Sequence, residues 1–139
     1  MNKQQSGFTL IELIAVIVIL SIMAATAVPR FINMQDEAAQ AAVNGVAGSL
    51  ESASALNHAV DVAVEAGLTN TTDDPFYNVA NCSEAARVLQ GGALPTGYSL
   101  NSVVIADKAT VTCEVTGPSP ASKSAEFQMI GAAGGITPS

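Results

Sequence analysis

The sequence predicts an α+β protein in which one long N-terminal helix packs on a small antiparallel β-sheet. An apolar run of membrane length covers residues 8–28, and apolar side chains at helical spacing follow in residues 33–66. Two later segments alternate apolar and polar side chains, as half-buried strands do. The 139 residues therefore divide into a short start at 1–7, an apolar helix at 8–28, its amphipathic continuation at 29–66 and a globular head at 67–139.

The apolar run predicts a helix that crosses a membrane. It holds 21 residues from Phe8 to Val28, and Glu12 carries its only charge. A charged side chain inside such a helix costs roughly 2.5–3.5 kcal/mol on insertion scales, so Glu12 needs a compensating partner. A cut after Gly7 would supply one, the new α-amino group of Phe8. The other interpretation is that Glu12 pairs with the positive start of its own helix.

Pro29 follows the apolar run, and we expect a kink or local melting there because proline removes a backbone donor. Residues 33–66 then form an amphipathic helix with Gly67 as its C-terminal cap. Asn57 interrupts the apolar face, and Asp61 is assigned to another face with other acidic residues. The apolar face comprises Ala39, Val43, Val46, Leu50, Ala53, Val60 and Val64.

The head begins with a loop-rich connector and ends with a sheet. A short helix is expected at 83–90, capped by Ser83 and ended by two glycines. Three antiparallel strands are expected at 98–106, 109–116 and 124–130, with turns at 107–108 and 117–120. The last residues, 131–139, are expected to form a mobile tail.

Cys82 and Cys113 are the only cysteines of the chain. An even count in an exported protein favours a disulfide, whereas a metal site or a redox pair lacks the required spacing. Closing a loop of about 32 residues would contribute roughly 3–4 kcal/mol to the stability of a small head.

Charge and side-chain chemistry exclude several functions. The net charge is −7, and the few cations are scattered, so no direct nucleic-acid binding is expected. His58 is assigned a structural role, and Asp73, Asp74 and Asp107 are assigned to solvated turns rather than to a calcium site. No nucleophile has a base at a recognisable spacing. We therefore expect no enzymatic activity, no metal and no cofactor.

The segment Gly7-Phe8-Thr9-Leu10-Ile11-Glu12 resembles the cleavage and methylation motif of type IV prepilins. The matching features are the small residue before the cut, the Phe after it and the Glu at the fifth mature position. Pro29 also matches the family pattern. The leader at 1–7 resembles those of type IVa prepilins, and residues 28–38 resemble mannose-sensitive haemagglutinin pilins.

This resemblance implies a pilin fold and a structural subunit of a bacterial surface filament that serves adhesion, motility or both. The precursor would be a single-pass inner-membrane protein, and the mature subunit an extracellular pilin. A prepilin peptidase would cut after Gly7 and methylate Phe8, while Glu12 would set the register of helices during assembly. The implied partners are copies of the chain in a helical homopolymer, the peptidase, the inner-membrane assembly machinery and, before assembly, lipid.

Several alternatives share parts of this pattern. The first is a pseudopilin of a type II secretion system, which carries the same N-terminal motif. A monotopic binding protein held by one span is another. An ordinary secretory signal peptide cut near Ala27 and a plain membrane anchor would both leave Glu12 unexplained.

Overall fold

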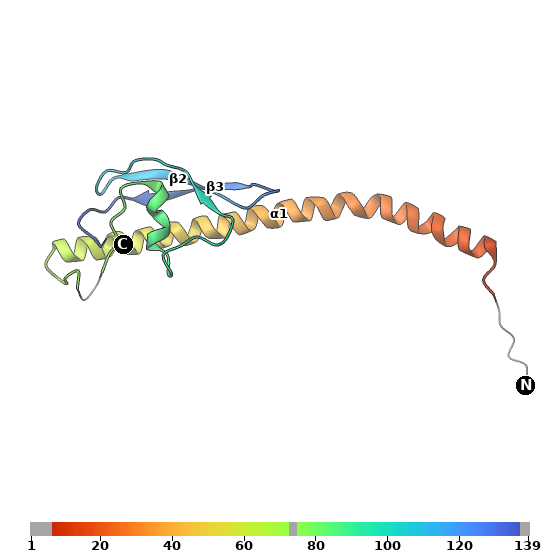
Figure 1. The fold of residues 1–139 in the computed structure, drawn as a ribbon, viewed down its shortest axis with the longest axis horizontal. Helices are drawn as coiled ribbons and strands as arrows, with labels where there is room; N and C mark the ends of the chain where they lie inside the picture. The colour runs from red at the N-terminus through yellow and green to blue at the C-terminus, as the bar shows by residue number, and fades with distance from the viewer. Residues whose placement is uncertain (1–6, 73–74, 137–139) are drawn as a thin grey trace, which may run out of the picture. The chain divides into compact units, whose positions relative to one another are not determined.

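A computed structural model of the chain describes residues 7–72 and 75–136 (Figure 1). The described elements are the helix α1 (Leu10–Glu65), the 3-10 helix η1 (Cys82–Val88) and the strands β1 (Ser99–Leu100), β2 (Thr110–Thr116) and β3 (Ser124–Ile130). This arrangement confirms the expected α+β class. The chain divides into two compact units, Met1–Glu37 and Ala38–Ser139. Most of the expected leader, Asp73 and Asp74 among the calcium candidates, and the end of the expected tail lie outside the described residues.

The first unit consists of the apolar part of α1. Its most apolar window has a mean hydropathy of 2.6 and no buried residue, so α1 is long and apolar enough to cross a membrane. The hydroxyls of Ser21 and Thr26 donate to the helix carbonyls of Ile17 and Met23, which satisfies both groups within the helix. The helix is continuous through Pro29, so the local melting expected there does not occur.

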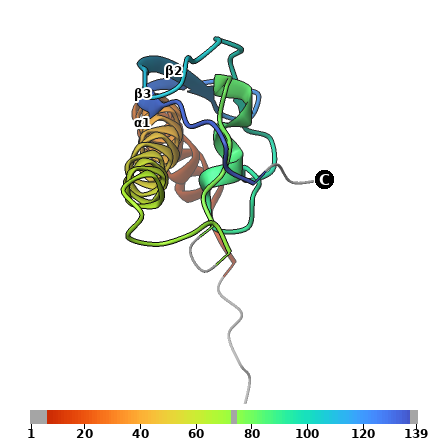
Figure 2. The ribbon, with the colours of Figure 1, turned by 90° about the vertical axis from the view of Figure 1, so that its left-hand side faces the viewer.

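The second unit holds the hydrophobic core. Val43, Ala47 and Leu50 of α1 are buried together with side chains of the sheet and the connector. The sheet and the chain that carries η1 both lie beside this part of α1 (Figure 2). The other core residues are Val79, Cys82, Ala85, Ile105, Cys113, Val115, Phe127 and Met129.

The sheet has the order β1-β2-β3, with both pairs antiparallel. β2 and β3 occupy the expected positions, and the register that pairs Cys113 with Phe127 directs the alternating apolar side chains to the core. The expected strand at 98–106 is wrong beyond Leu100, because the chain there leaves the sheet and Val104 instead bridges to Asn81 in the connector. The β-branched residues of this expected strand predicted half-buried side chains, yet Val103 and Val104 are exposed.

The end of α1 confirms the expected glycine cap. Gly67 has a φ of 73°, a left-handed conformation that glycine adopts without steric strain. Its N–H donates to Val64 at 3.0 Å, and the N–H of Leu68 donates to Ala63 at 3.0 Å, which completes a Schellman motif.

The short helix of the connector differs from the expectation in type and cap. It is a 3-10 helix, Cys82–Val88, and its N-cap is Asn81 rather than Ser83. The side-chain oxygen of Asn81 accepts hydrogen bonds from both the N–H and the hydroxyl of Ser83. An asparagine ahead of the helix competes well for this position, because its carbonyl reaches the first free backbone donors.

The expected mobile tail is also wrong for residues 131–136. Val79 and Ala132 exchange two backbone hydrogen bonds, and the N–H of Ile136 donates to Phe76. Gly131 is buried, and a Cβ at this position would overlap the carbonyl oxygen of Ala106. Gly131 and Gly135 permit close packing of backbone on backbone.

Polar side chains of α1 cover the edge of β3 that faces away from β2. Ser54 accepts the N–H of Ile130 at 2.9 Å, and Gln40 donates to the carbonyl of Ser124 at 2.9 Å. These bonds replace the partners that another strand would supply, so the edge is closed to further pairing at these residues.

Candidate functional site

The expected cleavage position lies just ahead of α1. Gly7 and Phe8 precede the first helical residue and lie outside regular secondary structure. Phe8 is 85% exposed, and no heavy atom lies within 4 Å of a Cβ built on Gly7. The peptide bond between them is therefore accessible in this conformation.

Glu12 takes part in a capping box at the start of α1. Its carboxylate accepts the N–H of Thr9 at 2.9 Å and the Thr9 hydroxyl at 2.7 Å. In return the N–H of Glu12 donates to the Thr9 hydroxyl at 3.3 Å. This is the second of the two interpretations of Glu12, an anion at the positive start of its own helix. Thr9 was not predicted as a partner of Glu12, although Thr and Glu three residues apart are the signature of this motif.

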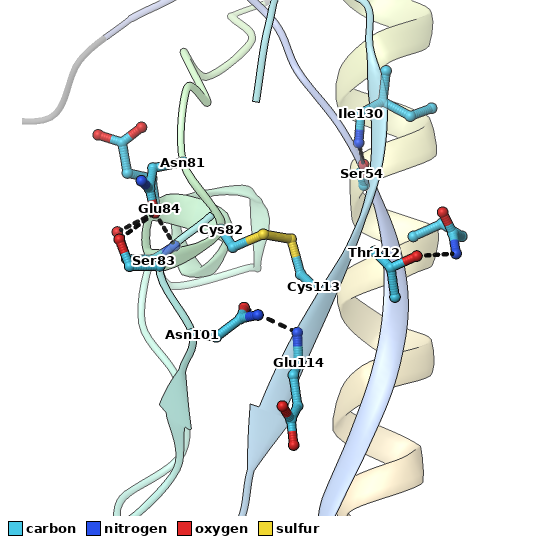
Figure 3. The surroundings of a disulfide bond; sticks show 12 residues. Ser54, Asn81, Cys82, Ser83, Glu84, Asn101, Thr112, Cys113, Glu114 and Ile130 are labelled. Atoms are coloured by element: carbon cyan, nitrogen blue, oxygen red, sulfur yellow. Dashed lines mark hydrogen bonds between the residues drawn. A yellow bond between two sulfur atoms is a disulfide. The ribbon is translucent and has the colours of Figure 1, made fainter. Parts of the chain in front are cut away.

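Cys82 and Cys113 form a disulfide that joins the start of η1 to the middle of β2 (Figure 3). Their Cα atoms are 5.7 Å apart, which is a usual separation for a disulfide. Both residues are fully buried in the core. The bond therefore ties the connector to the sheet, two parts of the head that are distant in sequence.

Two asparagines form side-chain hydrogen bonds beside the disulfide. Asn81 also accepts the hydroxyl of Ser102 at 3.2 Å, and Asn101 accepts the N–H of Glu114 at 3.0 Å (Figure 3). Glu84 in η1 accepts the N–H of Ala80. Sequence reasoning missed the roles of both asparagines, although an asparagine directly before a short helix was a detectable signal for Asn81.

An open groove of about 540 Å³ lies between α1 and the connector. Its lining is mostly aliphatic and includes Leu56, Val60 and Val88. The hydroxyls of Ser49 and Ser52, which also line it, donate to carbonyls of their own helix. The groove therefore offers apolar contact rather than an activated nucleophile.

The remaining candidates occupy structural positions. Asp107 accepts the N–H of Ala133, and its neighbour Lys108 pairs with Glu65. In the part of the chain that the structure describes, no group of three or more His, Cys, Asp or Glu side chains could hold a metal ion.

His58 lies beside Asp61, which is buried on the face of α1 that packs on the head. The expectation that Asp61 belongs to another face is therefore wrong, and its neighbours on this face, Ser54 and Asn57, are polar as well.

Two features together define a class of pilin-like proteins. The first is a membrane-length apolar helix with a polar N-terminal motif, and the second is a small disulfide-bonded α+β head that follows it. The prokaryotic N-terminal methylation motif matches residues 2–28. The chain is 38% identical over 96 residues to the type IV narrow pilus major component PilA5 of Thermus thermophilus, and the alignment covers 69% of this chain and 78% of that protein. The chain therefore belongs to the type IV pilin family.

A second relative is the type II secretion system core protein G of Pseudomonas aeruginosa. It is 43% identical over 54 residues, which cover 36% of this chain and 38% of that protein. No solved structure matches the chain significantly.

Proposed function

We propose that the chain is a structural subunit of a type IV pilus-like surface filament. It would be made as a single-pass inner-membrane precursor and assembled after removal of residues 1–7. The observation that carries this proposal is the apolar part of α1, whose large side chains from Phe8 to Phe31 are all exposed where they are described. Membership of the type IV pilin family and the similarity to a pilus major component support it.

The exposed apolar segment requires an environment that the chain does not provide. In the precursor this environment would be lipid, which suits a helix with a mean hydropathy of 2.6. In the filament it would be the same segment of other copies. Lipid and apolar helices are similarly apolar, so close packing between helices supplies the driving force for the transfer.

Processing is proposed at the bond between Gly7 and Phe8. Both residues are exposed and lie ahead of the helix, where a peptidase can reach the backbone. Mass spectrometry of the mature protein should find Phe8 at the amino terminus, N-methylated. An intact Met1 or a cut near Ala27 in assembled material would contradict the proposed processing.

Glu12 is proposed to act in two successive settings. In the single subunit its carboxylate closes the capping box with Thr9, which keeps the charge hydrogen-bonded inside lipid. During assembly the methylated amine of Phe8 on a neighbouring subunit would become its counter-ion. This pair would set the register between helices more than it adds net stability.

A type II secretion pseudopilin is the second candidate function, because the second relative is a core protein of that system. The shorter shared length of 54 residues makes it the weaker candidate. Electron microscopy of producing cells distinguishes the two. Long surface filaments that disappear on deletion of the gene support a pilus subunit, whereas loss of protein secretion without loss of filaments supports a pseudopilin. Adhesion and twitching assays on the same strains would then assign the role of the filament.

A further inference from the structure

The buried face of α1 carries three polar residues in succession, Ser54, Asn57 and Asp61. Their spacing of three and four residues places them on one side of the helix. All three are buried within the second unit, and Asp61 is only 2% exposed. Each polar group in such a position needs a partner, because burial removes its hydrogen bonds to water.

The first two residues have found partners in the backbone of the head. Ser54 accepts the N–H of Ile130 at 2.9 Å. Asn57 donates to the carbonyl of Tyr77 at 2.9 Å and accepts the N–H of the same residue at 2.7 Å. These bonds fasten β3 and the connector to α1.

The third residue has no such partner. The Oδ2 atom of Asp61 is buried and has no hydrogen bond among the residues that the structure describes. Its neighbour is Nδ1 of His58, one turn earlier, at 3.9 Å, and this nitrogen is also buried without a hydrogen bond. The side chain of His58 as a whole is 30% exposed.

Charged groups from two elements surround this pair. Glu65 lies one turn later on α1, and Asp107 and Lys108 lie in the turn before β2. Burial, followed by the negative charges of Glu65 and Asp107, raises the pKa of Asp61, while Lys108 and His58 act in the opposite direction. The positive charge of Lys108 is already engaged by Glu65.

We propose that His58 and Asp61 form a proton-dependent lock between α1 and the head. With a proton on Asp61, the carboxyl is neutral and its burial no longer isolates a charge. With a proton on His58, the two side chains form an ion pair. When both have lost their protons, a buried carboxylate faces a neutral ring, and the packing of the end of α1 on the turn at Asp107 weakens.

The sign of the effect follows from the raised pKa of Asp61. Between the unfolded pKa of about 3.9 and the higher folded value, the folded state binds more protons than the unfolded state. The stability that this group contributes is therefore complete below the unfolded pKa, and it is lost as the pH rises through the folded pKa.

The test is thermal unfolding of the full chain in detergent micelles between pH 4 and pH 9. The variant Asp61→Asn keeps the shape of the side chain but cannot ionise. At pH 8 it should melt about 4 °C above the wild type, and this difference should shrink towards zero at pH 4. The control Glu37→Gln changes an exposed carboxylate of the same helix and should show a small shift that does not depend on pH.

A difference between Asp61→Asn and wild type that is constant with pH, or a lower melting temperature at every pH, would overturn the proposal. The variant His58→Gln and the double variant complete a thermodynamic cycle. Non-additivity of the melting shifts should differ between pH 5.5 and pH 8.5. Equal non-additivity at both values would show that the contact does not depend on a proton. Because these measurements use single subunits, their outcome does not depend on filament assembly.

Discussion

The two halves of α1 reverse the usual relation between hydropathy and burial. In the first half, nearly every side chain is apolar, yet Leu13, Ile17 and their large apolar neighbours are all exposed. In the second half, the buried face includes a serine, an asparagine and an aspartate. The large apolar side chains of the first half are exposed where the structure describes them, whereas the second half packs on the sheet and the connector. Whether a side chain of α1 is buried therefore depends on whether another part of the subunit packs on it. High hydropathy in an exposed segment indicates that the segment needs an apolar partner outside the subunit.

The reversal also separates two kinds of stability. The head depends on contacts within one chain, so its variants should change the free energy of unfolding. Under the proposed function the apolar half makes its contacts between chains, so its variants should change assembly while the head stays folded. The following experiments test this separation, in order of decreasing expected effect.

Substitution of Glu12 by Ala should reduce filament assembly by roughly two to four orders of magnitude, because loss of one partner of the proposed buried ion pair costs about 3–5 kcal/mol. Membrane insertion should be unchanged or improved, since a charge leaves the apolar segment. Glu12→Gln should give an intermediate defect. The measurement compares sheared surface filaments with the pool of processed subunit in the membrane.

Thr9→Val is the matched control for Glu12. It removes the capping partner but keeps the carboxylate, so assembly should fall by a much smaller factor than in Glu12→Ala. If Thr9→Val blocks assembly equally, the capping box rather than a neighbouring amine explains the importance of Glu12. If Glu12→Ala assembles at the wild-type level, the proposed register mechanism is wrong.

Replacement of both Cys82 and Cys113 by Ser should lower the free energy of unfolding of the head by about 3–4 kcal/mol. The reason is the freedom that the unfolded chain regains when the loop between them opens. Denaturant unfolding in micelles measures the change, and wild-type protein treated with reductant should behave similarly. Recovery of two free thiols from mature protein by peptide mapping would contradict the disulfide.

Leu50→Ala should destabilise the head by about 3 kcal/mol, because it leaves a cavity in the core. Leu56→Ala is the matched control on the same helix. Leu50 is fully buried, whereas Leu56 is 70% exposed in the single subunit, so the control should change stability by less than about 0.5 kcal/mol. Equal losses in the two variants would contradict the packing of α1 described above.

Ser54→Ala should have the smallest effect, a loss of about 1–2 kcal/mol, because it leaves the part-buried N–H of Ile130 without the Ser54 hydroxyl as acceptor. Ser52→Ala provides the comparison, since its exposed hydroxyl bonds only to its own helix. Amide hydrogen exchange at Ile130 should accelerate in the first variant alone. Unchanged exchange there would show that Ser54 does not protect the edge of β3.

Local patterns in the sequence were sufficient for much of the fold. The apolar run, the helical period of residues 33–66 and the alternation of β2 and β3 each depend on side chains a few positions apart, so they can be detected in one chain. The same holds for Gly67, whose capping role follows from its freedom at positive φ. The pairing of Cys82 with Cys113 was predictable because the chain offers no other pair.

The errors share a different physical origin. Val103 and Val104 have strand propensity, but Asn101 occupies the ladder position beside Glu114 and the chain then leaves the sheet. Residues 131–136 contain glycines typical of a loop, but those glycines allow the backbone to pack against the connector. In both places the outcome depends on a segment that is distant in sequence.

By itself, the sequence determined the class of the fold, the membrane-length helix and the N-terminal motif, because each is encoded by the type and spacing of neighbouring residues. Only the tertiary structure decided that Ser54 and Asp61 face the head, and which backbone groups pair with Asn57. A polar side chain can be buried where it meets a backbone group of another segment that would otherwise be unpaired. The backbone N–H groups of Ile130 and Tyr77 are such partners for Ser54 and Asn57. No periodicity within α1 contains that information, since the unpaired groups belong to β3 and the connector.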